Sequence, residues 1–222
     1  MIMLQQQPGI RLLNLHNTSE SRRDELRRQI AACSRRFMPV SASDLAIYCR
    51  TGEWSGSKPG LLLAFYNGYR NNFSTAVPIL EEFGMIGWFF VATDFISLPP
   101  DQQSRYCQTH ALHGLAGEFA DGRLALSPEE LRLMSRYHEI CSHTASHRVV
   151  FTDQTDPAEL KREILGSAQQ IESWTGQKPA AFCWLRGEQY ATCPAAHPYM
   201  QQAGYRFLFG SRSIEYLSLP GT

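Results

Sequence analysis

Residues 61–72 read LLLAFYNGYRNN, an apolar run that changes abruptly to tyrosine, asparagine and glycine. The run from Leu61 to Phe65 presents apolar side chains in both directions, as strands of a parallel sheet do when helices cover both faces. Tyr66, Asn67 and Gly68 follow at its carboxyl end. In α/β proteins this end of a strand carries the binding and catalytic side chains. The stretch therefore predicts a fold class and the position of a site within it.

Further segments have the composition of short strands, and helical patterns lie between them. The strand candidates are residues 11–16, 36–41, 60–66, 86–93, 138–143, 180–185 and 205–210. The helix candidates are residues 17–35, 41–52, 72–84, 127–137, 156–176 and 193–205. Regular β–α alternation in one unit predicts an α/β protein with a parallel sheet, closed into a distorted (β/α)₇ barrel. We expect a single domain over residues 1–222, with an insertion at about 97–126.

Several helix ends carry sequence signatures. Ser41 or Ser43 is a candidate N-cap for the second helix. Ser127 is a candidate N-cap, with Pro128 at the first helical position. Gly84 is a candidate C-cap. These signatures support the proposed alternation of strands and helices.

Composition limits the class of protein. The chain has 222 residues, 43% of them hydrophobic, and its 21 basic and 21 acidic residues give a formal net charge of +0. Such a balance offers no general attraction for nucleic acid or a membrane surface. No apolar run approaches the length of a membrane span, and the first residues lack the pattern of a signal peptide, so we expect a cytoplasmic protein. Six scattered cysteines without a C-x-x-C pair predict free thiols.

A second polar cluster, HEICSHTASH, occupies residues 138–147. One helical turn would place the imidazoles of His143 and His147 on one face, which suits two nitrogen ligands of a single divalent metal. The competing interpretation is a pair of solvated loop histidines, and the spacing alone does not exclude it. His110 and His113 have a similar spacing without a preceding strand, so we expect them to be solvent-exposed.

These segments together resemble the polysaccharide deacetylase family, carbohydrate esterase family four. NLHNTSE matches the opening of one branch of the family, with His16 at the end of the first strand. The first-motif region is similar to LLLAFYNGYRNNFSTAVPILEEFGMIGWFFVATDFI, and the second motif to HEICSHTASH. KPAAFCWLRGEQYA stands at the place of the third motif, and AGYRFLFG resembles a late strand. The similarity extends from about residue 11 to residue 210.

The resemblance implies a metal-dependent hydrolase that removes N-acetyl groups from amino-sugar polymers. In the family, one aspartate and two histidines hold a divalent metal, commonly zinc, and a second aspartate deprotonates the attacking water. His143 and His147 match the two metal-binding histidines. An acetylated amino-sugar or other glycan is the partner that the resemblance implies, with no nucleic acid.

Both aspartates of the first motif are replaced in this chain. The family's Thr-Phe-Asp-Asp-Gly corresponds to Ala64-Phe65-Tyr66-Asn67-Gly68. Tyr66 takes the place of the general base, but a phenol with a pKa of about 10 donates a proton at neutral pH. Asn67 takes the place of the metal ligand, and its neutral amide oxygen is a weaker donor than a carboxylate. We expect a weakened metal site.

The third motif departs as well. The family's Pro-Tyr-Gly corresponds to Leu185-Arg186-Gly187. The backbone amide of Arg186 would keep the family's role of stabilising an oxyanion, because a backbone donor survives a change of side chain. Alternatively, Arg186 fills the pocket or pairs with Glu188. Both alternatives stay open.

Three other residues are candidates for the site. His16 is a possible substrate contact, with a satisfied core histidine as the alternative. Trp184 is the tryptophan that we expect near the pocket, where its ring would stack on a sugar. Asp94 follows a strand, and we expect it to cap the next turn rather than act as a base.

Two functional hypotheses follow, and they leave enzyme status open. The first is a hydrolase of N-acetyl amide bonds, that is, of carbon–nitrogen bonds other than peptide bonds, with an impaired or altered active site. His143, His147 and Asn67 would bind zinc, while Tyr66 and Arg186 would contact substrate. The second is a catalytically inactive pseudoenzyme that binds a glycan or a protein partner.

Overall fold

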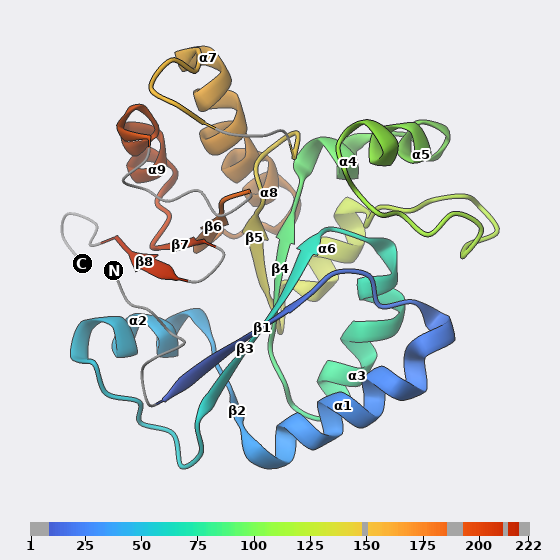
Figure 1. The fold of residues 1–222 in the computed structure, drawn as a ribbon, viewed down its shortest axis with the longest axis vertical. Helices are drawn as coiled ribbons and strands as arrows, with labels where there is room; N and C mark the ends of the chain where they lie inside the picture. Colours follow the sequence, from blue (N-terminus) through green and yellow to red (C-terminus); the bar gives the residue numbers. More distant parts are fainter. Residues whose placement is uncertain (1–8, 148–150, 186–192, 211–212, 218–222) are drawn as a thin grey trace.

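The computed structural model describes residues 9–147, 151–185, 193–210 and 213–217 of a curled α/β fold (Figure 1). Its strands are β1 Ile10–Leu15, β2 Met38–Pro39, β3 Gly60–Asn67, β4 Gly87–Val91, β5 Glu139–Ser142, β6 Ala181–Cys183, β7 Phe207–Phe209 and β8 Ile214–Tyr216. The sheet has the order β1-β3-β4-β5-β6-β7-β8, with β2 paired to β3. Neighbouring strands are parallel except β7 and β8, which are antiparallel. The sheet therefore forms a partly closed (β/α) barrel in a single domain.

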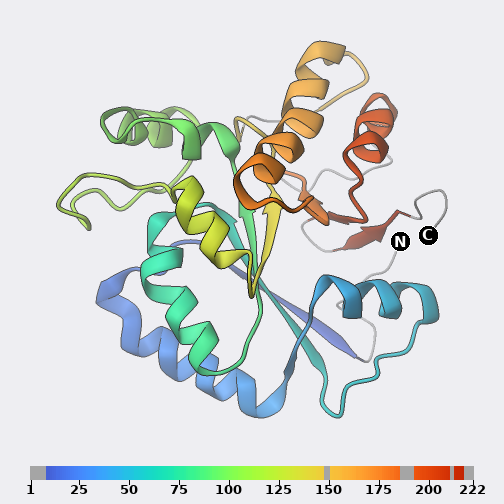
Figure 2. The same ribbon diagram turned by 180° about the vertical axis from the view of Figure 1, so that it is seen from behind.

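Helices surround the outer face of this sheet (Figure 2). The α-helices are α1 Arg23–Arg36, α2 Ala42–Thr51, α3 Val77–Glu82, α4 Thr93–Ser97, α5 Pro100–Thr109, α6 Pro128–Met134, α7 Pro157–Leu160, α8 Ser167–Thr175 and α9 His197–Ala203. Short 3₁₀ turns occupy Glu20–Arg22 and Pro194–Ala196, and π-helical segments occupy Asn72–Ala76 and Lys161–Gly166. Apolar side chains of α1, α3, α6 and α8 share one core with the outer face of β3 and β4. Helix α2 packs with the inner face.

Strand β3 divides its side chains between two cores, and all eight of its residues are buried. Leu61, Leu63 and Phe65 enter the outer core beneath the helices. Leu62, Ala64 and Tyr66 enter the inner core, which also holds residues of β5, β6 and β7. This alternation is the ordinary consequence of the two-residue repeat of a strand. It points the Tyr66 ring into the barrel.

The turn after β3 depends on backbone conformations that few residues adopt. Asn67 has φ 81° and Gly68 has φ 86°. Asparagine tolerates positive φ better than most residues, and glycine has no side chain to oppose it. At Gly68 a Cβ atom would lie 2.9 Å from Cδ1 of Ile96 and 3.2 Å from Cβ of Val91. Asparagine followed by glycine therefore fits both the backbone and the space at this position.

The two asparagines that follow fix neighbouring loops. Asn71 accepts a hydrogen bond from the Thr18 amide at 3.1 Å, and its amide nitrogen donates to Glu118 at 2.8 Å. Asn72 donates to the His16 carbonyl oxygen at 2.8 Å. Both asparagines are buried, so these bonds satisfy groups that water cannot reach. The sequence NGYRNN thereby ties the end of β1 and the loop after α5 to the end of β3.

All the expected strands are present, but several details differ from expectation. The segment 36–41 contributes only Met38–Pro39, because proline has no N–H to extend a ladder. Strand β8 was missed, and it adds an antiparallel edge to a sheet that we expected to be parallel throughout. The two π-helical segments were also missed. Among the described residues, no helix is both long and apolar enough to cross a bilayer.

The helix caps agree with the sequence where it was specific. Ser41 caps α2 in a reciprocal capping box with Asp44, which settles the choice between Ser41 and Ser43. Ser127 caps α6, with Pro128 at the start of the helix. Gly84 has φ 62° just beyond α3. Residues 97–126, where we expected an insertion, contain α5 and the long loop that follows it.

Candidate active site

A cavity of about 420 Å³ opens at the carboxyl ends of the strands. Its described lining residues are Asn14, His16, Tyr66, Asn67, His110, Ala111, His113, His143, His147, Cys183, Trp184, Leu185 and Gly210. They come from the ends of β1, β3, β5, β6 and β7 and from the loop after α5. The lining thus includes five of the chain's seven histidines. Among these described lining residues there is no aspartate or glutamate.

Tyr66 forms part of the cavity wall. Its ring stacks on Phe90 with centroids 5.3 Å apart, and it lies 5.4 Å from the rings of both His16 and His143. Its hydroxyl donates a hydrogen bond to the Asn14 side-chain oxygen at 3.0 Å. Burial raises the pKa of Tyr66 well above its ordinary value. The side chain at the expected position of the general base is therefore a protonated hydrogen-bond donor.

Asn67 is buried, with 4% of its surface exposed. Its side-chain nitrogen donates to the Tyr69 hydroxyl at 2.9 Å. Its side-chain oxygen has no hydrogen-bond partner. A buried acceptor without a partner is rare in folded proteins and calls for an explanation, of which an absent ion is one. Asn67 lines the cavity, and its buried side-chain oxygen is the one polar atom of this side chain that no hydrogen bond satisfies.

Backbone carbonyls orient the two motif histidines. Nδ1 of His143 lies 3.0 Å from the Cys183 carbonyl oxygen, and Nδ1 of His147 lies 2.9 Å from the His110 carbonyl oxygen. A carbonyl oxygen can only accept, so each Nδ1 carries the proton and each Nε2 keeps its lone pair. This second bond is the usual way in which proteins orient metal-binding histidines. The two rings lie 5.0 Å apart, centroid to centroid.

The two histidines come together by a route that differs from the expected one. Residues 143–147 form no helical turn. Instead, Thr144 has φ 67° and His147 has φ 53°, so a tight turn folds His147 back toward His143. Burial lowers the pKa of His143 to about 3, with the nearby His147 as the second cause. His143 is therefore neutral at physiological pH, as a metal ligand must be.

The donor set fits a divalent metal in part. His143, His147 and Asn67 line one cavity, Asn67 has an unpartnered side-chain oxygen, and imidazole nitrogen with oxygen is a suitable donor set for zinc. Within residues 9–147, 151–185, 193–210 and 213–217, however, no three His, Cys, Asp or Glu side chains gather as a metal site would require. The third donor is a neutral amide. The set therefore supplies less negative charge than two histidines with an aspartate.

The loop after α5 contributes histidines that the sequence did not assign to the site. We expected His110 and His113 to be solvent-exposed, which is wrong for His110. Its ring is half-buried and stacks on Tyr106 with centroids 3.8 Å apart. His113 is exposed but lies at the cavity mouth, where its amide donates to the Tyr69 hydroxyl at 2.8 Å and its carbonyl accepts from Asn17. No local sequence signal identifies this loop, because contacts with distant residues place it.

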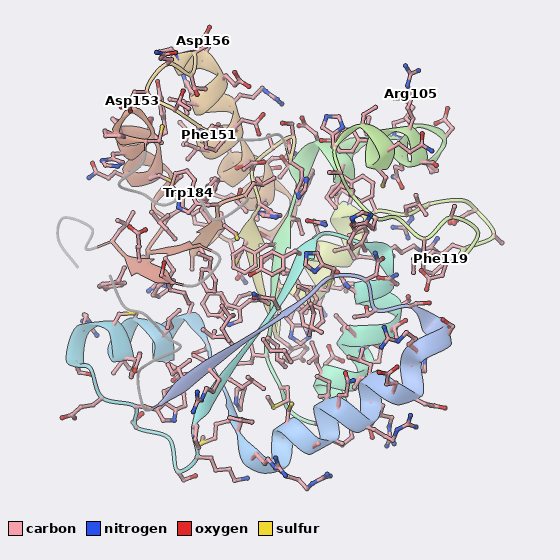
Figure 3. The ribbon with its side chains drawn as sticks, in the orientation of Figure 1. Arg105, Phe119, Phe151, Asp153, Asp156 and Trp184 are labelled. Atoms are coloured by element: carbon pink, nitrogen blue, oxygen red, sulfur yellow. The ribbon has the colours of Figure 1, made fainter. Side chains whose placement is uncertain are left out.

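The other predicted site residues occupy different surroundings. His16 lies at the cavity mouth, where the pKa of its imidazole is lowered first by desolvation and then by the nearby His113. Trp184 borders the cavity with only 3% exposure, and its ring packs edge-on against Phe151 and Phe182. Figure 3 shows Trp184 and Phe151 together on the side of α9. Arg186, including its expected backbone role, lies outside the described residues.

Asp94 does not act as expected. It lies in the first turn of α4, and its carboxylate pairs with Arg162 at 2.8 Å instead of capping the helix. It is not among the residues that line the cavity. The long-range ion pair with Arg162, on the π-helical segment Lys161–Gly166, takes the place of the local capping bond. Asp94 therefore serves neither as a cap nor as a base in the cavity.

The architecture is shared with deacetylases of known structure. A deacetylase from Streptococcus pyogenes, PplD, solved in complex with acetate, superposes with a TM-score of 0.65 at 13% identity, covering 89% of this chain and 80% of that one. IcaB from Ammonifex degensii gives 0.67 at 18% identity, covering 91% and 83%. The BpsB deacetylase domain from Bordetella bronchiseptica gives 0.62 at 16% identity, covering 90% and 88%. At these identities the likeness establishes the fold alone.

Sequence comparison carries the assignment further. No curated protein matches the chain. The family model described as polysaccharide deacetylase matches residues 55–208, which is more than half of the chain. The matched region holds the Tyr66-Asn67 turn and the His143–His147 pair. The chain therefore belongs to the polysaccharide deacetylase family.

Proposed function

We propose that this protein binds acetylated amino-sugar chains in its cavity and hydrolyses their N-acetyl amide bonds slowly or not at all. One observation carries the proposal: the described cavity wall contains no carboxylate, and at the position of the general base the Tyr66 hydroxyl donates its proton to Asn14. Water must lose a proton as it attacks an amide carbon. Loss of the group that takes this proton costs about two to four orders of magnitude in rate.

In this proposal His143, His147 and Asn67 hold one divalent ion, with zinc as the best match to two imidazoles and an oxygen. When bound, the ion supplies a Lewis acid that polarises a carbonyl oxygen and lowers the pKa of a bound water. The chain's own contribution is to keep both Nε2 lone pairs directed by the carbonyl bonds of Cys183 and His110. A neutral Asn67 oxygen makes the affinity lower than an aspartate would.

A second function, a hydrolase with an altered site, is favoured by the retained histidine geometry. The two rings are 5.0 Å apart, and both are oriented from behind by backbone carbonyls. A cavity that binds a glycan only through its shape does not require two histidines oriented in this way. In the altered hydrolase, residual acetate release would depend on His143 but not on the Tyr66 hydroxyl.

The first measurement is the zinc content of the purified protein by mass spectrometry, with His143→Ala as the control. The proposal expects zinc in the wild type after incubation with the ion and its loss in the variant. Absence of zinc from the wild type would overturn the metal part of the proposal. Binding of glycan is a separate question and needs its own assay.

The second experiment separates binding from hydrolysis. The zinc-incubated protein is mixed with a fully acetylated chitooligosaccharide, and binding is followed by calorimetry and hydrolysis by acetate release. We expect binding without appreciable release, and release in the double variant Tyr66→Asp/Asn67→Asp that disappears when His143→Ala is added. Wild-type release within tenfold of the double variant would favour the altered hydrolase instead. Absence of binding to the acetylated chain would remove it as the ligand.

A further inference from the structure

Glu163 is the one buried aspartate or glutamate in the part of the chain that the structure describes, with 1% of its surface exposed. It lies on the π-helical segment Lys161–Gly166, outside the cavity. A buried carboxylate costs free energy unless hydrogen bonds and an opposite charge compensate it. The groups in contact with the Glu163 carboxylate supply this compensation.

Among the described residues, the Glu163 carboxylate accepts hydrogen bonds from one turn and one arginine. Oε2 accepts hydrogen bonds from the amides of Ala145 at 2.9 Å and Ser146 at 2.8 Å. Oε1 accepts from the Ser146 hydroxyl at 2.8 Å and from the Arg162 guanidinium. Charged acceptors give stronger hydrogen bonds than neutral ones. Glu163 therefore binds the backbone amides between His143 and His147.

Other elements hold the remaining backbone groups of this turn. The Thr144 carbonyl accepts from the Thr93 amide at 3.4 Å, and the Ala145 carbonyl accepts from the Asp94 amide at 2.8 Å. The Ser146 carbonyl accepts from the Tyr106 hydroxyl at 2.6 Å. These bonds hold the carbonyls alone. Among the residues that the structure describes, only Glu163 accepts from the Ala145 and Ser146 amides, so without it both would be buried donors lacking an acceptor there.

The turn matters for His147 more than for His143. The His143 amide donates to the Val91 carbonyl at 2.9 Å, which extends the β4–β5 ladder by one bond. His147 lies beyond any strand, and its position depends on the unusual φ values of Thr144 and of His147 itself. Such conformations are unfavourable for residues other than glycine and persist only where surrounding contacts enforce them. Within the turn the His147 amide donates to the Thr144 hydroxyl at 3.0 Å, and Glu163 adds three hydrogen bonds to a charged acceptor from outside it.

We propose that Glu163 is a positioning residue that fixes the 144–147 turn and thereby sets the placement of the His147 ring relative to His143. Arg162 completes the arrangement, because its guanidinium bridges Glu163 and Asp94. The pairing neutralises the buried charge and joins the segment carrying Glu163 to the start of α4. The zinc readout of this proposal rests on the metal site proposed above, whereas the backbone readout does not.

The test compares Glu163→Ala with Glu163→Gln. The glutamine keeps one oxygen for the two amides, while alanine removes every contact. Glu129→Gln is the matched control, because Glu129 also pairs with an arginine, Arg132, but lies exposed on α6 away from the cavity. Hydrogen exchange of the Ala145 and Ser146 amides, measured by NMR without metal, reports on the turn. Zinc affinity, measured by competition with a chromogenic chelator, reports on the histidine pair.

We expect Glu163→Ala to lose amide protection at Ala145 and Ser146 and to bind zinc about ten- to a hundredfold more weakly, as when groups that orient metal ligands are removed. Glu163→Gln should retain most of both properties, and Glu129→Gln should match the wild type. A folded Glu163→Ala protein with wild-type protection and affinity would overturn the proposal. So would equal losses in the alanine and glutamine variants.

Two further outcomes are also decisive. If Glu163→Ala does not fold, the proton shifts of the Ala145 and Ser146 amides in Glu163→Gln decide: upfield movement supports the proposal and unchanged shifts overturn it. If the wild type binds no zinc, the proposed metal site fails. Amide exchange then tests the role of Glu163 in the turn independently.

Discussion

The Tyr66 hydroxyl donates a hydrogen bond to the Asn14 side-chain oxygen over 3.0 Å, which links the end of β3 to the edge strand β1. The bond directs the phenol proton toward β1, and the ring is held between Phe90 and the two histidines at 5.3–5.4 Å. Tyr66 therefore acts as a packed structural side chain with a polar tip. Its role in the cavity can be tested without disturbing the histidine pair.

Tyr66→Phe removes only the hydroxyl. We expect the free energy of unfolding to fall by about 1 kcal/mol, the usual net value of one hydrogen bond, because water can replace it at the exposed Asn14. Glycan binding should remain, and any trace of acetate release should be unchanged. Urea unfolding measures the change in stability, and an acetate assay measures the release of acetate. A marked loss of acetate release would show that the phenol takes part in chemistry.

Asn67→Asp should tighten zinc binding by about tenfold or more, equivalent to ~1.4 kcal/mol, because a carboxylate adds the negative charge that the present donor set lacks. The Tyr69 hydroxyl, which now accepts from Asn67, can turn to donate to the new carboxylate. Asn14→Asp is the control, since it adds the same charge to the cavity wall at a different place. Calorimetric titration with zinc compares them. Equal gains in both variants would mean that overall charge, and not ligation by residue 67, sets the affinity.

Gly68→Ala should destabilise the fold by about 2–3 kcal/mol. A positive φ accounts for about 1 kcal/mol, and contact with Ile96 adds the rest, because a Cβ atom would lie 2.9 Å from its Cδ1. Gly84→Ala isolates the first term, since Gly84 has φ 62° and nothing within 4 Å of its Cβ position. Denaturant midpoints give the difference. Equal losses at both positions would disprove the crowding argument.

His138 should make the fold sensitive to acid. It is buried at the amino end of β4, where the Gly87 amide donates to its Nδ1 at 3.2 Å and leaves the proton on Nε2. Burial lowers the pKa of His138 from 6.5 to about 4. Glu81 lies 3.9 Å from Nε2, too far for a hydrogen bond, and is half-exposed, so it does not offset the desolvation.

The direction of this pH dependence follows from the number of protons that His138 binds in the folded and unfolded states. Between pH 6.5 and about 4 the unfolded chain holds more protons at this histidine than the folded protein does. The contribution of neutral His138 to the free energy of unfolding is therefore fully present above pH 6.5. It is lost as the pH falls, by about 2 kcal/mol at pH 5. His138→Asn keeps an acceptor for Gly87 but does not titrate, so it should lose less stability between pH 7 and 5. Parallel pH profiles for the two proteins would contradict the prediction.

Much of the fold could be predicted because strands and helices differ in period and have distinct ends. The run from Leu61 to Phe65 identifies a central strand, and Ser127-Pro128 identifies the start of a helix. Strand β8 has no comparable signal, since three residues cannot establish a period. The expected strand around Pro39 is short because proline has no N–H to donate to the ladder. Whether this loss ends a strand depends on where the proline lies in the ladder, which composition does not reveal. π-helical segments depend on packing in the same way.

The site was predictable where its residues follow strands. Tyr66, Asn67, His143 and His147 were placed together from sequence, and all four line one cavity. The loop histidines were not, because distant groups such as Tyr69 and Tyr106 fix them. Glu163 gave no sequence signal either, since a glutamate in a helical pattern is ordinarily exposed. The positions of these residues depend on long-range contacts, which a local sequence pattern does not reveal.

The positive φ of Asn67 limits which residues the position accepts. Asparagine and aspartate share shape and tolerance of this backbone conformation, so exchange between them leaves the turn intact in either direction. At position 66 the situation differs, because the tyrosine ring fills space against Phe90 that an aspartate would leave empty. Aspartate at position 66 therefore costs stability that aspartate at position 67 does not. The two positions differ in how readily they accept a carboxylate: packing opposes it at 66, while at 67 a single conservative substitution supplies it.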